Sequence, residues 1–111
     1  MYNKQNMRIT ASDLNKNIDK YILIDIREKY ERDADGHIPN DIHYPMSTIG
    51  DDFIELLKKQ TAENFVVIYC HSSNRSSKLL IELDKITDTS KIYDLIGGYS
   101  IYKGSGYITD K

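Results

Sequence analysis

Short apolar runs alternate with helical patterns along this chain. Apolar runs of about five residues end at Ile26, Tyr69 and Leu95, and apolar residues between them recur at helical spacing. The pattern predicts strands at residues 8–9, 21–26, 42–44, 65–69 and 91–95. It predicts helices at residues 10–14, 28–34 and 76–85, and one that starts at Ser47 or Thr48 and places Phe53, Ile54, Leu56 and Leu57 on its apolar side. Buried runs separated by helices are typical of parallel strands covered on both faces, so the sequence predicts an α/β fold.

Cap and turn residues mark the ends of several of these elements. Thr10 can cap the first helix through its side-chain oxygen. Asp35-Gly36 is expected to end the second helix, and Pro45 is expected to stop the short third strand. Gly97-Gly98 follows the last strand and predicts a tight turn that brings the C-terminal segment over the loop after Tyr69.

Cys70 is the only cysteine of the chain, and it stands where the predicted strand 65–69 leads towards the helix that starts at Ser76. Backbone N–H groups at a helix N-terminus favour negative charge, which stabilises a thiolate there. Ligands of parallel sheets bind beyond the carboxyl ends of the strands, which is where Cys70 lies. The context therefore favours a nucleophile. The alternative is a core cysteine, since free cysteine is among the most buried residue types.

Composition indicates an ordinary globular chain of one domain, residues 1–111. The 111 residues are 40% hydrophobic and 29% charged, with a net charge of −2 and both signs mixed along the sequence. This pattern favours neither nucleic-acid binding nor a membrane span. Met1 to Asn6 contain no apolar segment, so no signal peptide is expected. A lone cysteine cannot form an internal disulfide, which fits the reducing cytoplasm, and the three scattered histidines predict no metal site.

Four segments, in order, resemble the signatures of the rhodanese-like domain family. They are the strand Ile22 to Glu28 with its Asp-x-Arg ending, the Gly36-His37-Ile38-Pro39 segment with the apolar stretch to Pro45, the loop Cys70 to Ser76, and the Asp94-Leu95-Ile96-Gly97-Gly98-Tyr99 turn. Their order and spacing match over roughly residues 8–107. The resemblance implies a three-layer fold with a central, mostly parallel five-stranded sheet and helices on both faces.

The resemblance also implies a function, sulfur transfer through a covalent persulfide. The Cys70 thiolate would attack the outer sulfur of a donor such as thiosulfate, and the persulfide would then pass that sulfur to a thiophilic acceptor. A protein persulfide is a further possible donor or acceptor, and no metal or cofactor is needed. Backbone N–H groups of the loop would form an anion-binding nest around the sulfur. The substrate-binding residues implied are His71, Ser72, Ser73, Asn74, Arg75 and Ser76.

The loop departs from the family pattern at two positions. Ser73 stands where the family commonly has glycine, so strain is expected there, and Asn74 is expected to take up part of the left-handed turn. His71 stands where sulfurtransferases that use thiosulfate often have arginine, which puts thiosulfate preference in question; we expect it to be a rim residue. Arg75 has two interpretations: it binds an oxyanion or the persulfide, or it pairs with a buried carboxylate such as Asp25.

Other matched residues are expected to be structural. Gly and Pro in the Gly36–Pro39 segment are typical of a turn scaffold rather than a catalytic site. Asp25, Arg27 and Glu31 are expected to form an ion-pair network near a strand end. Tyr102 stands near a position where the family often has tryptophan, and is expected to pack as that aromatic ring.

Two other functions remain as alternatives. The same fold hosts Cys-dependent phosphatases and arsenate reductases, but the loops of those enzymes hold five residues between Cys and Arg. Only four lie between Cys70 and Arg75, which suits one sulfur atom better than a tetrahedral phosphate. The third possibility is an interaction module that lost its chemistry, and the presence of Cys70 argues against it.

Overall fold

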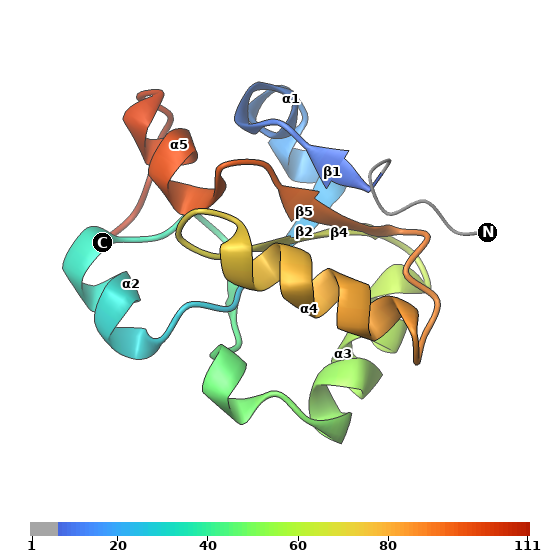
Figure 1. Cartoon of the computed structure of the whole chain (residues 1–111). Helices are drawn as coiled ribbons and strands as arrows, with labels where there is room; N and C mark the ends of the chain where they lie inside the picture. The colour runs from blue at the N-terminus through green and yellow to red at the C-terminus, as the bar shows by residue number, and fades with distance from the viewer. Residues whose placement is uncertain (1–6) are drawn as a thin grey trace.

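A parallel five-stranded sheet forms the centre of the computed structural model, which describes residues 7–111 (Figure 1). The signal-peptide expectation concerned residues 1–6 and lies outside the described residues. The strand order is β1-β5-β4-β2-β3, and every neighbouring pair is parallel. The strands are β1 (Arg8–Ile9), β2 (Tyr21–Asp25), β3 (Ile42–His43), β4 (Phe65–Tyr69) and β5 (Ile92–Leu95). The helices are α1 (Ala11–Lys16), α2 (Lys29–Asp35), α3 (Asp51–Thr61), α4 (Asn74–Asp84) and α5 (Gly98–Gly104).

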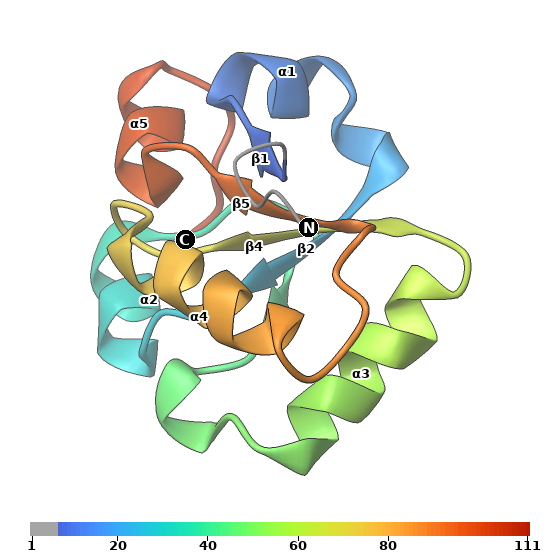
Figure 2. The same cartoon turned by 45° about the vertical axis from the view of Figure 1, so that its right-hand side comes forward.

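Helices cover both faces of the sheet, which confirms the expected three layers (Figure 2). Successive residues of the central strand β4 point to opposite faces, as in any strand. Val66 and Ile68 pack with α3 and α4, whereas Val67 and Tyr69 pack with α1 and α5. Every residue of β4 after Phe65 is buried. The continuous apolar run at residues 65–69 is therefore explained by burial on both faces.

The predicted strands match within one residue, whereas every predicted helix is shifted by one residue or more at one or both ends. The helix expected from Ser47 or Thr48 is a 3₁₀ turn at Met46–Thr48, and α3 begins only at Asp51. The Thr48 hydroxyl donates to the Pro45 carbonyl instead of capping a helix, and the extended Gly50 separates the two elements. The last helix, α5, was not predicted from the sequence.

Capping and turn chemistry fixes the start of α1 and both ends of α2. The Thr10 side chain accepts the Asp13 N–H at 3.1 Å, as predicted. Glu28 and Glu31 form a capping box at the start of α2, in which Glu31 Oε2 accepts the Glu28 N–H at 2.8 Å. The helix ends at Gly36, whose φ of +86° suits glycine.

The segment from Gly36 to Pro39 is a turn scaffold, as expected. His37 and Asp110 exchange two backbone hydrogen bonds of 2.8 Å, which tie the C-terminal segment to this turn. The His37 ring lies 2.9 Å from Asp41 Oδ1 through Nδ1. These contacts give the histidine a structural role in the turn.

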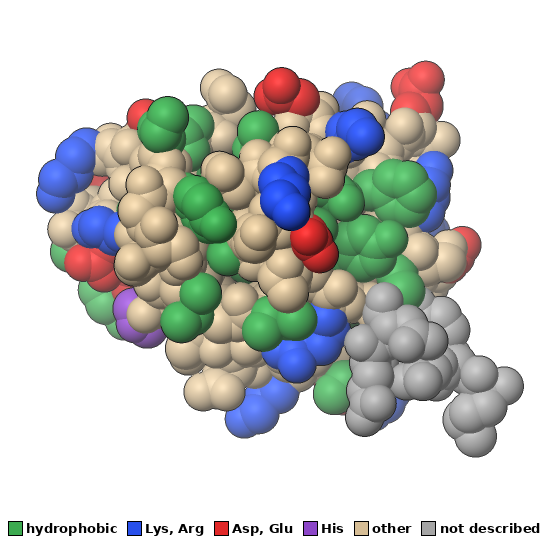
Figure 3. Space-filling model, turned by 90° about the horizontal axis from the view of Figure 1, so that it is seen from above, with side chains coloured by type: hydrophobic (Ala, Val, Ile, Leu, Met, Phe, Trp, Pro, Cys, Tyr) green, Lys and Arg blue, Asp and Glu red, His purple; other side chains and the backbone are tan. Residues whose placement is uncertain are grey.

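Charged side chains of both signs lie among hydrophobic ones on the face seen from above in Figure 1 (Figure 3). The mixture agrees with the small net charge of −2. Within residues 7–111, none of the helices has the length and apolar character needed to cross a membrane.

Candidate active site

Cys70 follows β4 directly, at the carboxyl edge of the sheet, and is 1% exposed. Its Sγ accepts the Ser76 backbone N–H at 3.4 Å and lies 3.4 Å from the Ser76 Oγ. Ser76 belongs to the first turn of the 11-residue helix α4, whose N-terminal dipole favours negative charge on the sulfur. Within the described residues, this sulfur forms its hydrogen bonds with Ser76, and the hydroxyls of Ser72 and Ser73 form none with it.

Ser73 carries the left-handed turn of the loop. Its φ of +75° and ψ of −3° place a non-glycine residue in the αL region, so the expectation of strain is confirmed. The expectation that Asn74 absorbs part of this turn is wrong, because Asn74 is already the first residue of α4. The helix thus begins two residues earlier than predicted, since Ser73 completes the reversal alone.

Arg75 pairs with Glu31 of α2, and not with Asp25 as the sequence suggested. Two guanidinium nitrogens donate to the two carboxylate oxygens of Glu31, at 2.7 and 2.6 Å. This bidentate geometry lowers the pKa of Glu31 to about 2 and raises the pKa of Arg75. Arg75 therefore remains cationic, and its side chain, 36% exposed, joins the loop to α2.

A buried charged cluster holds α2 against the sheet. Asp25 accepts hydrogen bonds from Arg27, at 2.9 Å from Nη2, and from Arg32, at 3.0 Å. Arg32 also donates to Asp41 at 2.7 Å, and Tyr69 donates its hydroxyl to Asp41 at 2.6 Å. Burial, together with Asp25 and Asp41, raises the pKa of Tyr69, so its hydroxyl stays protonated and keeps donating. The expected network exists, but Asp25 and Arg27 are joined in it by Arg32, Asp41 and Tyr69, and Glu31 pairs with Arg75 instead.

Arg27 is fully buried, and the ring of Tyr99 lies against its guanidinium, one nitrogen of which has no hydrogen-bond partner in the described chain. Burial opposes the charged guanidinium, but hydrogen bonds from it to Asp25 outweigh this effect and raise the pKa of Arg27. In the described chain its Nη1 has no hydrogen-bond partner. The guanidinium carbon lies 4.2 Å from the centre of the Tyr99 ring, within the range of a cation–π contact. The network thus connects α2, the sheet and α5.

The N-terminal turn of α5 holds the active-site loop from the other side. Tyr99 and Ser100 donate their backbone N–H groups to the carbonyls of Cys70 and His71, each at 2.9 Å. Gly98 has a φ of +61°, and a Cβ there would lie 2.6 Å from both carbonyl oxygens. The expected Gly97-Gly98 turn is confirmed, and it lets the backbone approach the loop closely. Tyr102 of α5 is buried, 2% exposed, and packs in the core cluster that contains Leu14 of α1, as expected for the aromatic position.

Asp94 is a residue of this site that sequence reasoning did not single out. It lies on β5 beside Ile68 of β4, and it is 2% exposed. Its two carboxylate oxygens accept the hydroxyls of Ser76 and Ser77, the latter at 2.7 Å. A signal was available: an acidic residue in an otherwise apolar buried strand requires polar partners.

The remaining loop residues, His71, Ser72 and Asn74, are exposed, so His71 lies at the rim as expected. A cavity of about 460 Å³ opens beside His71, between the end of α2 and the outer side of α5. Lys103 contributes to its wall and donates to the Asp35 carbonyl at 2.9 Å. The cavity adjoins the loop at His71.

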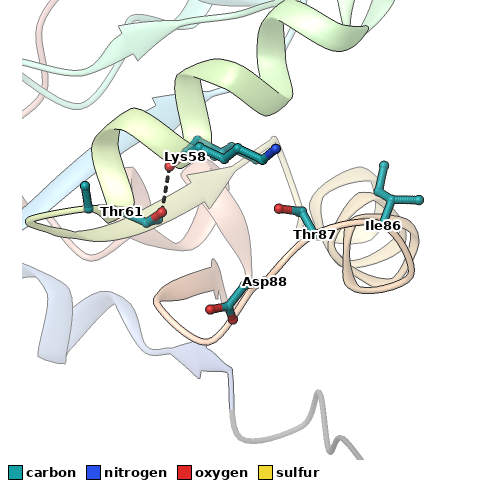
Figure 4. Close-up of a pocket in the computed structure, with 7 residues that line it drawn as sticks. Lys58, Thr61, Ile86, Thr87 and Asp88 are labelled. Atoms are coloured by element: carbon teal, nitrogen blue, oxygen red, sulfur yellow. Dashed lines mark hydrogen bonds between the residues drawn. The ribbon is translucent and has the colours of Figure 1, made fainter.

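A second cavity, of about 420 Å³, is drawn in Figure 4. Its lining residues place it at the edge of the sheet opposite Cys70. It is formed where α3 ends before β4 and where α4 ends before β5. Within residues 7–111, no group of three His, Cys, Asp or Glu side chains is arranged to hold a metal ion. The second cavity is lined by Leu57, Lys58, Thr61, Ile86, Thr87 and Asp88, among others.

The fold and the site together define a class: α/β domains that present one cysteine on a short loop between a central parallel strand and a helix. The family model of the rhodanese-like domain matches residues 10–105. The chain therefore belongs to the rhodanese-like domain family. A comparison with curated proteins gave no match.

Solved structures show the same fold. A rhodanese-related protein from Thermoplasma volcanium is 30% identical, with a TM-score of 0.74, and the match covers 91% of this chain and 94% of that one. The rhodanese-like domain of an Anabaena protein is 19% identical, with a TM-score of 0.76 and coverages of 94% and 78%. An As–Sb reductase from Leishmania major is 24% identical, with a TM-score of 0.71 and coverages of 88% and 77%. The last two likenesses concern the fold alone.

Proposed function

We propose that this protein is a sulfurtransferase that carries sulfane sulfur as a persulfide on Cys70. The observation that carries the proposal is the setting of the sulfur: Sγ accepts the Ser76 N–H at the N-terminus of α4. This setting supports both a thiolate and the terminal charge of a persulfide. The single cysteine also suits a reducing compartment such as the cytoplasm.

The first half-reaction loads the enzyme. The Cys70 thiolate attacks the terminal sulfur of the donor, a new S–S bond forms, and the donor's own S–S bond breaks. The electron pair of that bond leaves with the donor, as sulfite from thiosulfate or as a thiolate from a persulfide. Because Cys70 is 1% exposed, a donor that presents a single terminal sulfur atom fits the approach best.

The second half-reaction unloads it. A thiophilic acceptor, cyanide or a thiolate, attacks the outer sulfur of the Cys70 persulfide. The enzyme's S–S bond breaks, and its electron pair returns to Cys70 as the thiolate. The two half-reactions share no ternary complex, so the kinetics are ping-pong.

The charges at the loop favour a persulfide donor over thiosulfate. Thiosulfate is a dianion, and a site selective for it requires free cations. The guanidinium of Arg75 is engaged by Glu31 in two hydrogen bonds, and His71 offers no permanent charge. A small persulfide or a protein persulfide makes no such demand. Thiosulfate is then expected to be a poor substrate with a high KM.

The same charges argue against a phosphatase or an arsenate reductase. Phosphate and arsenate esters require a cationic clamp and a ring of donors wide enough for a tetrahedral group. Four residues separate Cys70 and Arg75, and the fork of Arg75 already binds a carboxylate. The loop therefore suits one sulfur atom better than an oxyanion.

Transfer of sulfur from a small persulfide, and from thiosulfate, to cyanide tests the proposal. We expect turnover with ping-pong kinetics, a lower KM for the persulfide, and no turnover by Cys70→Ser. Hydrolysis of a phenyl phosphate is measured in parallel with the same variants. Phosphate release that depends on Cys70, without sulfur transfer, would replace this function by the phosphatase alternative.

A further inference from the structure

We propose that Asp94 is a positioning residue for Cys70 that acts through Ser76. In the resting protein the Asp94 carboxylate accepts a hydrogen bond from the Ser76 hydroxyl. The Ser76 oxygen therefore accepts a hydrogen bond from the Cys70 thiol and does not donate one to the sulfur. Asp94 thereby favours the thiol form of Cys70 and opposes the negative charge that the Ser76 N–H and the α4 dipole favour on the sulfur. The role belongs to the proposed function, but the experiment below needs no sulfur transfer.

The hydrogen-bond arithmetic of Ser76 carries the inference. A serine hydroxyl has one proton to donate. Its Oγ lies close to Asp94 Oδ1, 3.3 Å from the Ser73 carbonyl oxygen and 3.4 Å from the Cys70 Sγ. The Asp94 carboxylate is charged and is the nearest of these three acceptors, so the Ser76 hydroxyl donates its hydrogen bond to Asp94. Towards the sulfur the oxygen then presents only a lone pair, which is a partner for a thiol and not for a thiolate.

Asp94 also has partners that allow Ser76 to turn away. Ser77 donates its hydroxyl to Oδ2 at 2.7 Å, and Arg8 of β1 places its Nε 3.4 Å from the same oxygen. When the thiol proton has left to a base in solution, or when a persulfide has formed, the sulfur is an anion. The Ser76 proton can then turn to the sulfur while Ser77 and Arg8 continue to hold the carboxylate. Rotation of the Ser76 hydroxyl thus moves its hydrogen bond from the Asp94 carboxylate to the Cys70 sulfur.

Other charged groups around the sulfur stay the same in this comparison. Arg75 of α4 is bound to Glu31 and interacts electrostatically with Cys70, and His71 follows Cys70 on the loop. Asp94 faces it from β5. Variants of Asp94 and of its partner Ser77 therefore isolate the effect of this carboxylate on Cys70.

The test is the rate of iodoacetamide alkylation of Cys70 as a function of pH. Asp94→Asn removes the negative charge and frees the Ser76 hydroxyl for the sulfur. The midpoint of the rate profile should fall by about one pH unit, which makes alkylation roughly tenfold faster at low pH. Ser77→Ala removes a competing donor and tightens the hold of Asp94 on Ser76. Its midpoint should therefore move the other way, to higher pH.

The midpoint of the alkylation profile is expected to move in opposite directions in Asp94→Asn and Ser77→Ala. This difference distinguishes a positioning role of Asp94 from a general loosening of the fold. A variant that merely exposes the buried thiol alkylates faster at every pH, in both cases. An unchanged profile in Asp94→Asn, or shifts of the same sign in the two variants, would overturn the proposal. In a Ser76→Ala background the Asp94→Asn shift should shrink to less than half; a full shift there would show that the charge acts without Ser76. If Asp94→Asn does not fold, an unchanged Ser77→Ala profile overturns the proposal by itself.

Discussion

Replacing Ser73 with glycine is expected to stabilise the fold and leave the active-site loop in place. Ser73 has a φ of +75° and ψ of −3°, a conformation that costs a non-glycine residue roughly 1–2 kcal/mol. Glycine removes this cost but loses roughly 0.5–1 kcal/mol through the greater freedom of the unfolded chain. The Ser73 side chain makes no capping hydrogen bond to α4, so little else is lost. The net gain is about 0.7 kcal/mol, or about 3 °C in Tm.

Urea denaturation followed by circular dichroism measures this gain, with sulfur transfer assayed on the same samples. Ser100→Gly is the matched control, because it is the same substitution at an exposed residue of α5 with ordinary helical φ. There glycine is expected to lower the free energy of unfolding by about 0.5 kcal/mol. A Ser73→Gly variant that is destabilised as much as the control would refute the assignment of backbone strain to Ser73.

Three further substitutions have definite expected outcomes. The Arg75 hydrogen bonds depress the pKa of Glu31 to about 2, so the stability they provide is present above about pH 4.5 and lost as pH falls towards 2. Acid titration of stability should therefore show the wild type losing about 1 kcal/mol more than Glu31→Gln over this range, after allowance for solvent screening; equal losses would contradict the pairing. Gly98→Ala forces a Cβ against the Cys70 carbonyl and should cost more than about 2 kcal/mol in urea denaturation and reduce sulfur transfer at least tenfold. Tyr69→Phe leaves two buried partners without the hydroxyl, and thermal unfolding should report a loss of about 1–3 kcal/mol with the loop chemistry retained.

The sheet could be predicted from sequence because strands that are buried on both faces have short, continuous apolar sequences. The run at residues 65–69 matches β4 residue for residue. The position of Cys70 at a strand–helix junction followed from that run. By contrast, α5 has only seven residues, and both its first residue, Gly98, and the preceding Gly97 have positive φ, so helical periodicity could not identify it.

The partners of the charged residues could not be predicted, because they depend on contacts between distant segments. Arg75 meets Glu31, 44 residues earlier, only because α2 packs beside the loop. Ser76 meets Asp94 because β5 lies beside β4 in the sheet. The sequence shows which residues are charged, but only the tertiary structure determines which of them form pairs. The left-handed turn was expected at Ser73, but the part of it expected at Asn74 was wrong for a similar reason, since helix α4 starts at Asn74 and leaves Ser73 to make the turn alone.

Intact mass spectrometry tests the persulfide on Cys70 most directly. The protein is mixed with a small persulfide or with thiosulfate, desalted and weighed before and after addition of cyanide, with Cys70→Ser treated alongside. We expect the wild type to gain the mass of one sulfur atom, more readily from the persulfide, and to lose it to cyanide, while the variant stays unchanged. A folded wild type that gains no sulfur from either donor, or whose added sulfur cyanide cannot remove, would contradict sulfur transfer through Cys70.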